Sequence, residues 1–151
     1  MPNTYSILDV ANWFLSKESM TPKKLQKLTY YAQAWSNALS NRDLINDTVF
    51  EAWAHGPVSP VLFNKYRDYK WNYIPKVDTP PVFDVDSLDL LESVWITYGD
   101  RSANELEALT HTENPWRLAR QRAGASEGDR CQENITALDM KNYYSSIYIG
   151  D

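Results

Sequence analysis

Several residue types and motifs are scarce in this chain, and each absence excludes a class of protein. The 151 residues include one cysteine, Cys131, which rules out an internal disulfide and a four-cysteine zinc site and agrees with a reducing, cytoplasmic setting. No unbroken apolar run exceeds three residues, so we expect no membrane span and no membrane partner. The N-terminus lacks a basic region followed by an apolar stretch, so we also expect no signal peptide.

Positive charge is in short supply too. The chain has 15 Lys and Arg against 20 Asp and Glu, a net charge of −5. A nucleic-acid binder needs a clustered positive face that displaces counterions from the phosphates. We therefore do not expect nucleic acid as a partner, although a local basic patch remains compatible with this balance.

Signatures of catalysis and of metal binding are missing as well. We find no phosphate-binding glycine loop, no nucleophile elbow and no paired-histidine metal motif. His111-Thr-Glu113 matches the H-x-E of zinc deaminases, but that site needs two further thiolate ligands and the chain has one cysteine. We therefore predict no cofactor, no metal and no enzymatic activity. A site built from His55, His111 and carboxylates is kept as the enzymatic alternative.

Apolar and aromatic residues, by contrast, are plentiful. Hydrophobic residues make up 43% of the chain, with ten Tyr and six Trp, enough for the core of one domain spanning residues 1–151. The longest helical pattern, Thr21 to Leu39, begins with an N-cap threonine and a proline in the first turn. Apolar residues at spacings of three and four predict that one side of this helix is a wall of the core: Leu25, Leu28, Ala32, Trp35 and Leu39.

Six further stretches carry helix signals. Their starts are marked by N-cap residues or by proline in the first turn: Ser6, Ser59-Pro60, Asp86 or Ser87, Ser102 (a capping box with Glu105), Asn114-Pro115 and Thr136. We expect the helix that starts near Ser87 to be deeply buried. The polar stretch 124–134 should be a mobile surface loop.

One segment changes to a period of two. Residues 48–54 alternate between two faces, and with Leu44 and Ile45 they predict a small hairpin or two extended pieces, which Gly56-Pro57 ends. A third short strand, at an edge, is expected near residues 73–77. The predicted fold is therefore mainly α (α+β), a compact bundle of six or seven helices with a small two- or three-stranded antiparallel β element.

The corner at Gly56 and Pro57 is the first candidate site. His55 precedes it, and imidazole can serve as a ligand-binding group or a general base. A catalytic histidine needs an oriented partner, and the sequence identifies none, so we favour a structural corner with Trp53 in the core. His111 is interpreted as the end of the fifth helix, where its ring bonds to free carbonyls.

The side of the Thr21–Leu39 helix opposite its apolar stripe is the second candidate. It carries Lys23, Lys27, Tyr30 and Asn37, an aromatic ring among cations. This side is either a solvated face whose tyrosine is covered by a neighbouring helix, or a contact surface for an acidic protein partner. We take these four residues as the predicted partner-binding surface.

In combination, the motifs resemble those of a known family. VANWFL in the first helix is followed by LQKLTYYAQAW, EAWAHGPVSPVLFNKY and SANELEALTHTENPW. This series, which covers roughly residues 8–148, is similar to the Panacea domain of SocA-like antitoxins and phage-associated GepA-like proteins. The other matching positions are interpreted as mainly structural: Leu25, Leu28, Tyr31, Trp53, His55, Gly56, Pro57, His111, Pro115 and Trp116.

The resemblance implies an antitoxin that neutralises a cognate protein toxin by direct contact and has no enzymatic activity. Lys27 and Tyr30 are then the expected contact residues. Two alternatives stay open. One is an adaptor that delivers a bound toxin to a protease component, and the other is an enzyme that uses His55 or His111 with nearby carboxylates.

Overall fold

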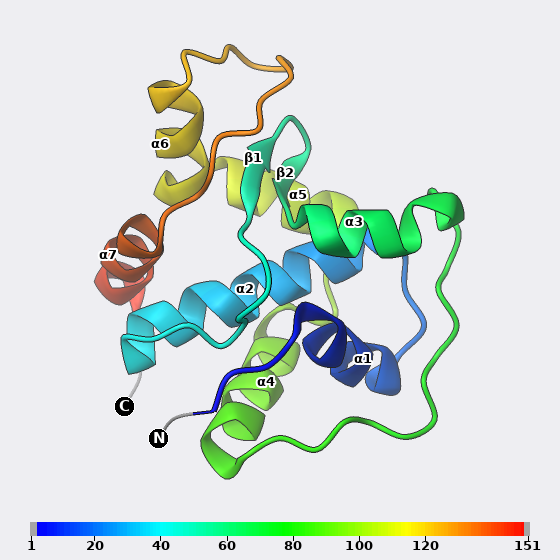
Figure 1. Ribbon diagram of the computed structural model, residues 1–151. Coiled ribbons are helices and arrows are strands. Elements are labelled where there is room, and N and C mark those ends of the chain that lie inside the picture. The colour runs from blue at the N-terminus through cyan, green and yellow to red at the C-terminus, as the bar shows by residue number, and fades with distance from the viewer. Residues whose placement is uncertain (1–2, 150–151) are drawn as a thin grey trace.

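Helices dominate the computed structural model, which describes residues 3–149. Within those residues there are seven α-helices, one 3-10 turn and a two-stranded sheet (Figure 1). In chain order they are α1 (Ile7–Lys17), α2 (Pro22–Ser40), β1 (Glu51–Trp53), β2 (Gly56–Val58), α3 (Pro60–Tyr66), η1 (Arg67–Tyr69), α4 (Val85–Tyr98), α5 (Ala103–His111), α6 (Asn114–Arg122) and α7 (Ala137–Ile147). The predicted class, mainly α with a small β element, is confirmed. None of the described helices has the length and apolar character needed to cross a membrane.

Most helix starts lie where the sequence predicts them. The Thr21 hydroxyl accepts from the amide of Lys24, and Ser102 forms a complete capping box with Glu105. Two starts differ by a residue or more. Asp84, rather than a later residue, caps α4, and Asn114 is the first residue of α6 instead of its cap. At α4 the Asp84 side chain accepts from the Ser87 amide, whereas the N-cap residue of α6, Glu113, makes no side-chain cap bond.

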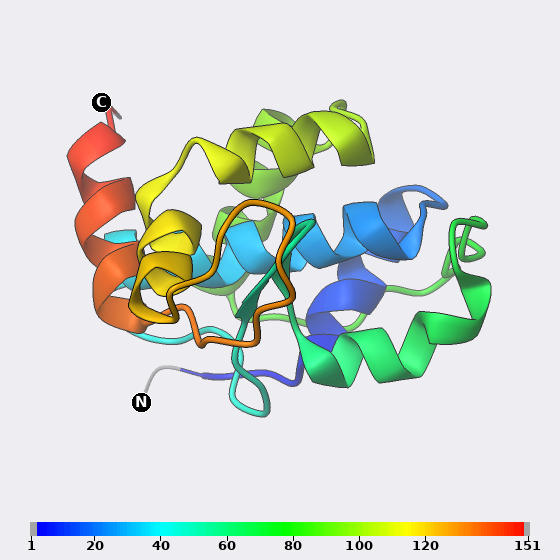
Figure 2. The same ribbon diagram turned by 90° about the horizontal axis from the view of Figure 1, so that it is seen from above.

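The helix α2 crosses the middle of the molecule and is enclosed on nearly all sides (Figures 1 and 2). It packs against α1, α3, α4, α5, α7 and β2. Leu25 and Leu28 are buried, as predicted, but Lys27 and Tyr30 on the opposite side are each only 1% exposed. Of the two alternatives for that side, an open contact surface is wrong at Lys27 and Tyr30, because other elements cover them; a neighbouring helix, α7, covers the tyrosine.

Two surfaces predicted to be core are partly open. Leu39, at the end of α2, is 48% exposed, and Trp35 is half-buried. The helix α4, predicted to be deeply buried, buries Leu91 and Tyr98 but leaves Ile96 in solvent. α4 lies at the outside of the bundle and packs against α2 with one side only (Figure 1).

The β element is displaced from its predicted position. β1 pairs with β2 in antiparallel register, Ala52 opposite Pro57 and Trp53 opposite Gly56, so the chain reverses at 54–55. Gly56-Pro57 thus belongs to the second strand and does not end the hairpin. The outer side of β1 is bonded to residues 133–135, where the Ala52 amide donates to the Glu133 carbonyl at 2.9 Å. Near residues 73–77, only an isolated bridge forms, between Ile74 and Met20.

Candidate functional site

A cleft of about 300 Å³ opens where the N-terminal half of α2, the hairpin and the α3–η1 segment meet. Figure 2 shows the hairpin crossing α2 and α3 lying alongside this half of it. Buried side chains of α2, β2 and α3 form the floor of the cleft: Gln26, Lys27, Val58 and Leu62. The walls and the rim are more exposed, and they consist of aromatic rings and cations.

Aromatic rings from the hairpin and from α3 form the walls. The rings of Trp53 and Phe63 meet edge to face with centroids 5.0 Å apart, and Phe63 is 42% exposed. The indole of Trp53 donates to the Glu51 carboxylate at 2.8 Å, which fixes the ring. Trp53 was predicted to lie in the core, but it is only half-buried because one side of its ring faces this cleft.

Gln26 holds the junction between β2 and α3 against α2. Its amide nitrogen donates to the carbonyl of Ser59 at 3.0 Å, and its side-chain oxygen accepts from the Ser59 amide at 2.8 Å. This pair of bonds satisfies two backbone groups at a buried chain reversal. Sequence reasoning missed Gln26, since no local pattern distinguishes it from a solvent-exposed glutamine on the same helix.

Lys27 lies beside Gln26 in the floor of the cleft. Its Nζ donates to the Pro57 carbonyl at 3.2 Å. Burial, together with repulsion from Lys23, outweighs the attraction of Glu107 and lowers the pKa of Lys27 to about 7. Lys27 is therefore a buried amine under the hairpin, and the prediction that it projects toward a partner from an open helix face is wrong.

Gly56 permits this close approach between the hairpin and α2. Its φ of +110° is a conformation that side chains with a Cβ rarely adopt. A Cβ at this position would lie 2.7 Å from Cε of Lys27 and 3.1 Å from the Thr110 hydroxyl. Gly56, Pro57 and Lys27 thus form one packing unit, which gives the glycine-proline corner a structural role.

A carboxylate from α5 neutralises one side of the rim. Glu107 forms an ion pair with Lys23, and its other oxygen lies 3.3 Å from Nδ1 of His55, whose side chain is 80% exposed. Partial burial raises the pKa of Glu107, but the bonds from Lys23 and His55 outweigh it and leave that pKa below its usual value. Glu107 is thus an oriented partner for His55 that the sequence did not reveal.

The opposite side of the rim carries two exposed cations, Arg67 and Lys70. Within residues 3–149 neither forms an ion pair. Lys70 has an unusual backbone, with φ 55° and ψ −111°, at the first central position of a turn closed by a 2.8 Å bond from the Asn72 amide to the Tyr69 carbonyl. That conformation belongs to a type II′ turn and favours glycine. No sequence motif marked either residue.

Tyr30 and Asn37, the other members of the predicted contact face, lie away from the cleft and are enclosed. Tyr30 packs edge to face on Phe50, and its hydroxyl lies 3.1 Å from that of Tyr144 on α7. The Asn37 amide donates to the Gln33 carbonyl at 3.0 Å. The predicted partner surface is therefore divided: Lys23 and Lys27 line the cleft, and Tyr30 and Asn37 belong to the interior.

The interior beside Tyr30 contains a buried carboxylate. Oε1 of Glu113 accepts from the hydroxyls of Tyr31 and Tyr144, each at 2.8 Å. The Tyr144 hydroxyl uses its hydrogen in the hydrogen bond to Glu113. Tyr30 is therefore the donor in the hydrogen bond between Tyr30 and Tyr144. Burial raises the pKa of Glu113 to about 6, against the opposing effect of the two phenols. Tyr31 also stacks on Tyr98 with centroids 3.9 Å apart, so this network joins α2, α4 and α7 with the N-cap residue of α6.

His111, Pro115 and Trp116 form the joint between α5 and α6. The rings of His111 and Trp116 stack with centroids 3.9 Å apart, and the indole donates to the Trp53 carbonyl at 2.8 Å. Nε2 of His111 is buried without a hydrogen-bond partner among the described residues, and burial lowers the pKa of this imidazole. His111 lines a separate cavity from the one that His55 lines. In the part of the chain that the structure describes, no group of three or more His, Cys, Asp or Glu side chains could hold a metal ion.

Comparison with known proteins assigns the chain to a family. The model of the family described as "Antitoxin SocA-like, Panacea domain" matches residues 25–117. The chain belongs to this SocA-like, Panacea-domain family. Antitoxin SocA of Caulobacter vibrioides (strain NA1000 / CB15N) is 30% identical over 145 residues, an alignment that covers 84% of this chain and 77% of that protein. No solved structure matches. The family expected from the motifs is confirmed, and its description is that of an antitoxin.

The matched part of this Panacea domain contains nearly the whole cleft. Of the side chains that line it, only Pro22 and Lys23 precede residue 25. The floor, both aromatic walls and the rim cations Arg67 and Lys70 all lie within the match. The cleft is therefore part of the region by which the chain is assigned to the family.

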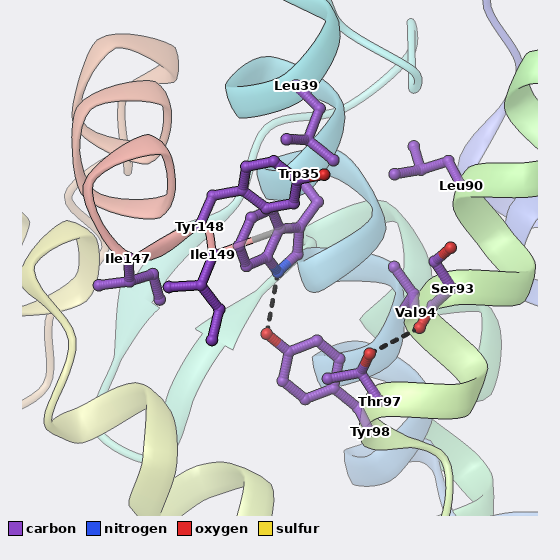
Figure 3. A pocket seen from close by; sticks show the side chains of 10 residues that line it. All are labelled: Trp35, Leu39, Leu90, Ser93, Val94, Thr97, Tyr98, Ile147, Tyr148 and Ile149. Atoms are coloured by element: carbon purple, nitrogen blue, oxygen red, sulfur yellow. Dashed lines mark hydrogen bonds between the residues drawn. The ribbon is translucent and has the colours of Figure 1, made fainter. Parts of the chain in front are cut away.

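A second depression in this Panacea domain lies between the ends of α2, α4 and α7 (Figure 3). It measures about 360 Å³, and Trp35, whose indole donates to the Tyr98 hydroxyl at 2.9 Å, forms one wall. Ile147, Tyr148 and Ile149 close one side of it and follow the matched region. None of the described residues that line this apolar groove is charged.

Proposed function

We propose that this Panacea domain is an antitoxin that neutralises a protein toxin by direct contact, and that the toxin docks on the cleft between α2, the hairpin and α3–η1. Family membership supports the antitoxin role. One observation supports the location: the cleft joins partly exposed aromatic rings to Arg67 and Lys70, which have no ion-pair partner within residues 3–149. Aromatic residues and arginine are enriched at the energetic centres of protein interfaces.

A stable complex needs more surface than the cleft alone. Specific protein interfaces bury roughly 1,200–2,000 Å² in total. The chain that follows the cleft supplies further exposed aromatic surface, since Trp71 and Tyr73 are largely in solvent. In this proposal Phe63 and Trp53 are the anchors, and the residues after Lys70 extend the contact. Neutralisation by occlusion requires no chemical step, so no residue is given a catalytic role.

The test compares two truncations on the same helix. Phe63 and Val61 of α3 are similarly exposed, at 42% and 39%, but only Phe63 lines the cleft. The toxin to use is the product of the neighbouring reading frame that is lethal unless this chain is co-expressed. With that toxin, Phe63→Ala should weaken binding at least tenfold in titration calorimetry and reduce rescue of growth. Val61→Ala should bind within about twofold of the original chain.

Either of two results would overturn the proposal. Equal affinities for the two variants would remove the cleft from the interface, and a toxin that is neutralised without binding this chain would remove direct contact. Both variants must first show unchanged denaturation midpoints, so that loss of binding is not loss of folding. The apolar groove supplies a further comparison, since Leu39→Ala there should leave the affinity unchanged.

The same strains separate occlusion from delivery to a protease. An occluding antitoxin leaves the half-life of the bound toxin unchanged or longer, because the toxin is simply held. An adaptor shortens that half-life, and deletion of one protease restores it. We propose occlusion, so the toxin measured by immunoblot after translation is stopped should persist in the presence of this chain. If the toxin is instead degraded faster in the presence of this chain, and deletion of a protease prevents this, the mechanism is delivery to a protease and not occlusion.

A further inference from the structure

The charges around the cleft differ in sign from those of the whole chain. The protein carries a net charge of −5, yet the cleft lining includes Lys23, Lys27, Arg67 and Lys70, and no Asp or Glu is among the described residues that line it. Glu107 neutralises Lys23 from behind the rim. Among residues 3–149 no carboxylate pairs with Arg67 or Lys70, so this mouth is a local basic patch on an acidic protein.

The interior of the cleft is apolar. Below the cations the surface consists of the rings of Trp53, Phe63 and Tyr66, with Val58 and Leu62 beneath them. A volume of about 300 Å³ lies at the lower end of the range for ligand cavities. It suits one or two inserted side chains rather than a whole helix. The cleft is apolar inside and positively charged at its mouth. It therefore complements a segment that inserts an apolar side chain and carries negative charges next to it.

The backbone at Lys70 shows that folding alone does not favour lysine there. The residue has positive φ at a turn position where glycine is much preferred, and such outliers cluster at binding sites. Glycine would relieve the strain and remove the cation together. Lys70→Gly therefore separates stability from recognition, because it should leave the fold at least as stable while it reduces the positive charge of the rim.

We propose that the cleft recognises an acidic, apolar segment of a protein partner, in which a large apolar side chain enters the cleft and packs against the rings of Trp53 and Phe63 while neighbouring carboxylates bind Arg67 and Lys70. The proposal rests on the cleft being the contact surface for the toxin. Beyond the location of the contact, it specifies the chemical character of the toxin segment that enters the cleft. Arginine and carboxylate can form two parallel hydrogen bonds, so Arg67 contributes most to the preference for an acidic segment.

The experiment selects binding peptides from a random library, so the partner need not be identified first. A phage library of random 12-residue peptides is panned against the purified chain, and the enriched sequences are synthesised and titrated. We expect enriched peptides to combine a large apolar residue with Asp or Glu within about three positions. Their affinity should fall at least tenfold in Arg67→Glu and roughly threefold in Lys70→Gly. It should also fall as salt is raised, because the contacts are charge pairs at the surface.

The control is Lys76→Glu, which reverses an exposed charge outside the cleft lining and should change the affinity by less than about twofold. Lys70→Gly must also melt no lower than the original chain. Enrichment of basic or purely apolar peptides, no enrichment at all, or equal affinities of Arg67→Glu and Lys76→Glu would overturn the proposal. Binding of a single-stranded oligonucleotide with the same dependence on Arg67 would also overturn it, in favour of general anion binding.

These outcomes are separable from those of the proposed function. If Phe63→Ala abolishes toxin binding but Arg67→Glu does not, the cleft is the contact surface and the acidic segment is wrong. If acidic peptides bind through Arg67 but the toxin binds elsewhere, the recognition chemistry holds and the assignment of the toxin to the cleft is wrong.

Discussion

Replacement of Lys27 by methionine tests the most unexpected feature of the structure, an amine enclosed under the hairpin. Methionine has a similar length and favours helix, so Lys27→Met keeps the shape of α2 and removes the charge. It also leaves the Pro57 carbonyl without its donor, a cost of about 1–3 kcal/mol that does not vary with pH. The dependence of stability on pH therefore isolates the contribution of the buried charge.

The magnitude follows from the two pKa values of Lys27, 10.5 in an exposed lysine and about 7 in the folded chain. Below pH 7 the amine is charged in both states, and the penalty for burying it is complete. Between pH 7 and pH 10.5 the folded chain releases a proton that the unfolded chain keeps, so stability rises with pH. From pH 7 to pH 9 this rise amounts to about 2 kcal/mol.

Urea denaturation followed by tryptophan fluorescence measures the effect. Lys27→Met lacks the rise, so its free energy of unfolding relative to the original chain should fall by about 2 kcal/mol between pH 7 and pH 9. Lys65→Met, which removes an exposed lysine of α3, corrects for the loss of one positive charge. A relative stability that is the same at both pH values would refute the reasoning. It would mean that solvent or a carboxylate reaches Nζ in the folded chain.

Two further predictions concern the packing around the cleft and the buried carboxylate. Gly56→Ala should destabilise the chain by roughly 2–4 kcal/mol in the same assay, since it combines backbone strain with a contact on Lys27. Gly128→Ala, at positive φ in open space, should cost no more than about 1 kcal/mol, and equal costs would show that the contact is unimportant. For Glu113 the folded pKa is raised from 4.5 to about 6, so its stabilising contribution is complete below pH 4.5 and is lost as pH rises through 6. Glu113→Gln should therefore gain about 2 kcal/mol relative to the original chain between pH 4 and pH 7, and a gain that does not depend on pH would contradict the burial of this charge.

The local signals in the sequence were reliable because they act within a turn of the chain. The Thr21 hydroxyl, and Ser102 together with Glu105, satisfy amides only three residues away, so no distant part of the fold can overrule them. The hairpin was less well predicted. Alternation identified β1, but the position of the reversal depends on Gly56, whose conformation is set by its contact with α2.

The orientation of α2 shows where sequence reasoning fails. The spacing of Leu25 and Leu28 correctly identified an apolar side, but it could not decide between a covered tyrosine and an open contact surface on the opposite side. Whether a polar side of a helix is covered depends on what else packs against it. Here Tyr144, near the end of the chain, covers Tyr30, and the hairpin covers Lys27. Neither contact leaves a signal in the periodicity of α2, because a helix enclosed all round can still contain polar residues that bond to each other.

The sequence by itself determined most of the helix starts, the mainly α fold class and the family, since caps, proline positions and motif order are properties of short stretches. Only the tertiary structure decided which of those residues share a site. In the folded chain Lys27 lies in the floor of the cleft and not on an open surface, and Tyr30 is enclosed. Arg67 and Lys70 lie at the mouth of the cleft. The physical reason is that burial and charge pairing depend on neighbours distant in sequence, which the chain acquires only on folding.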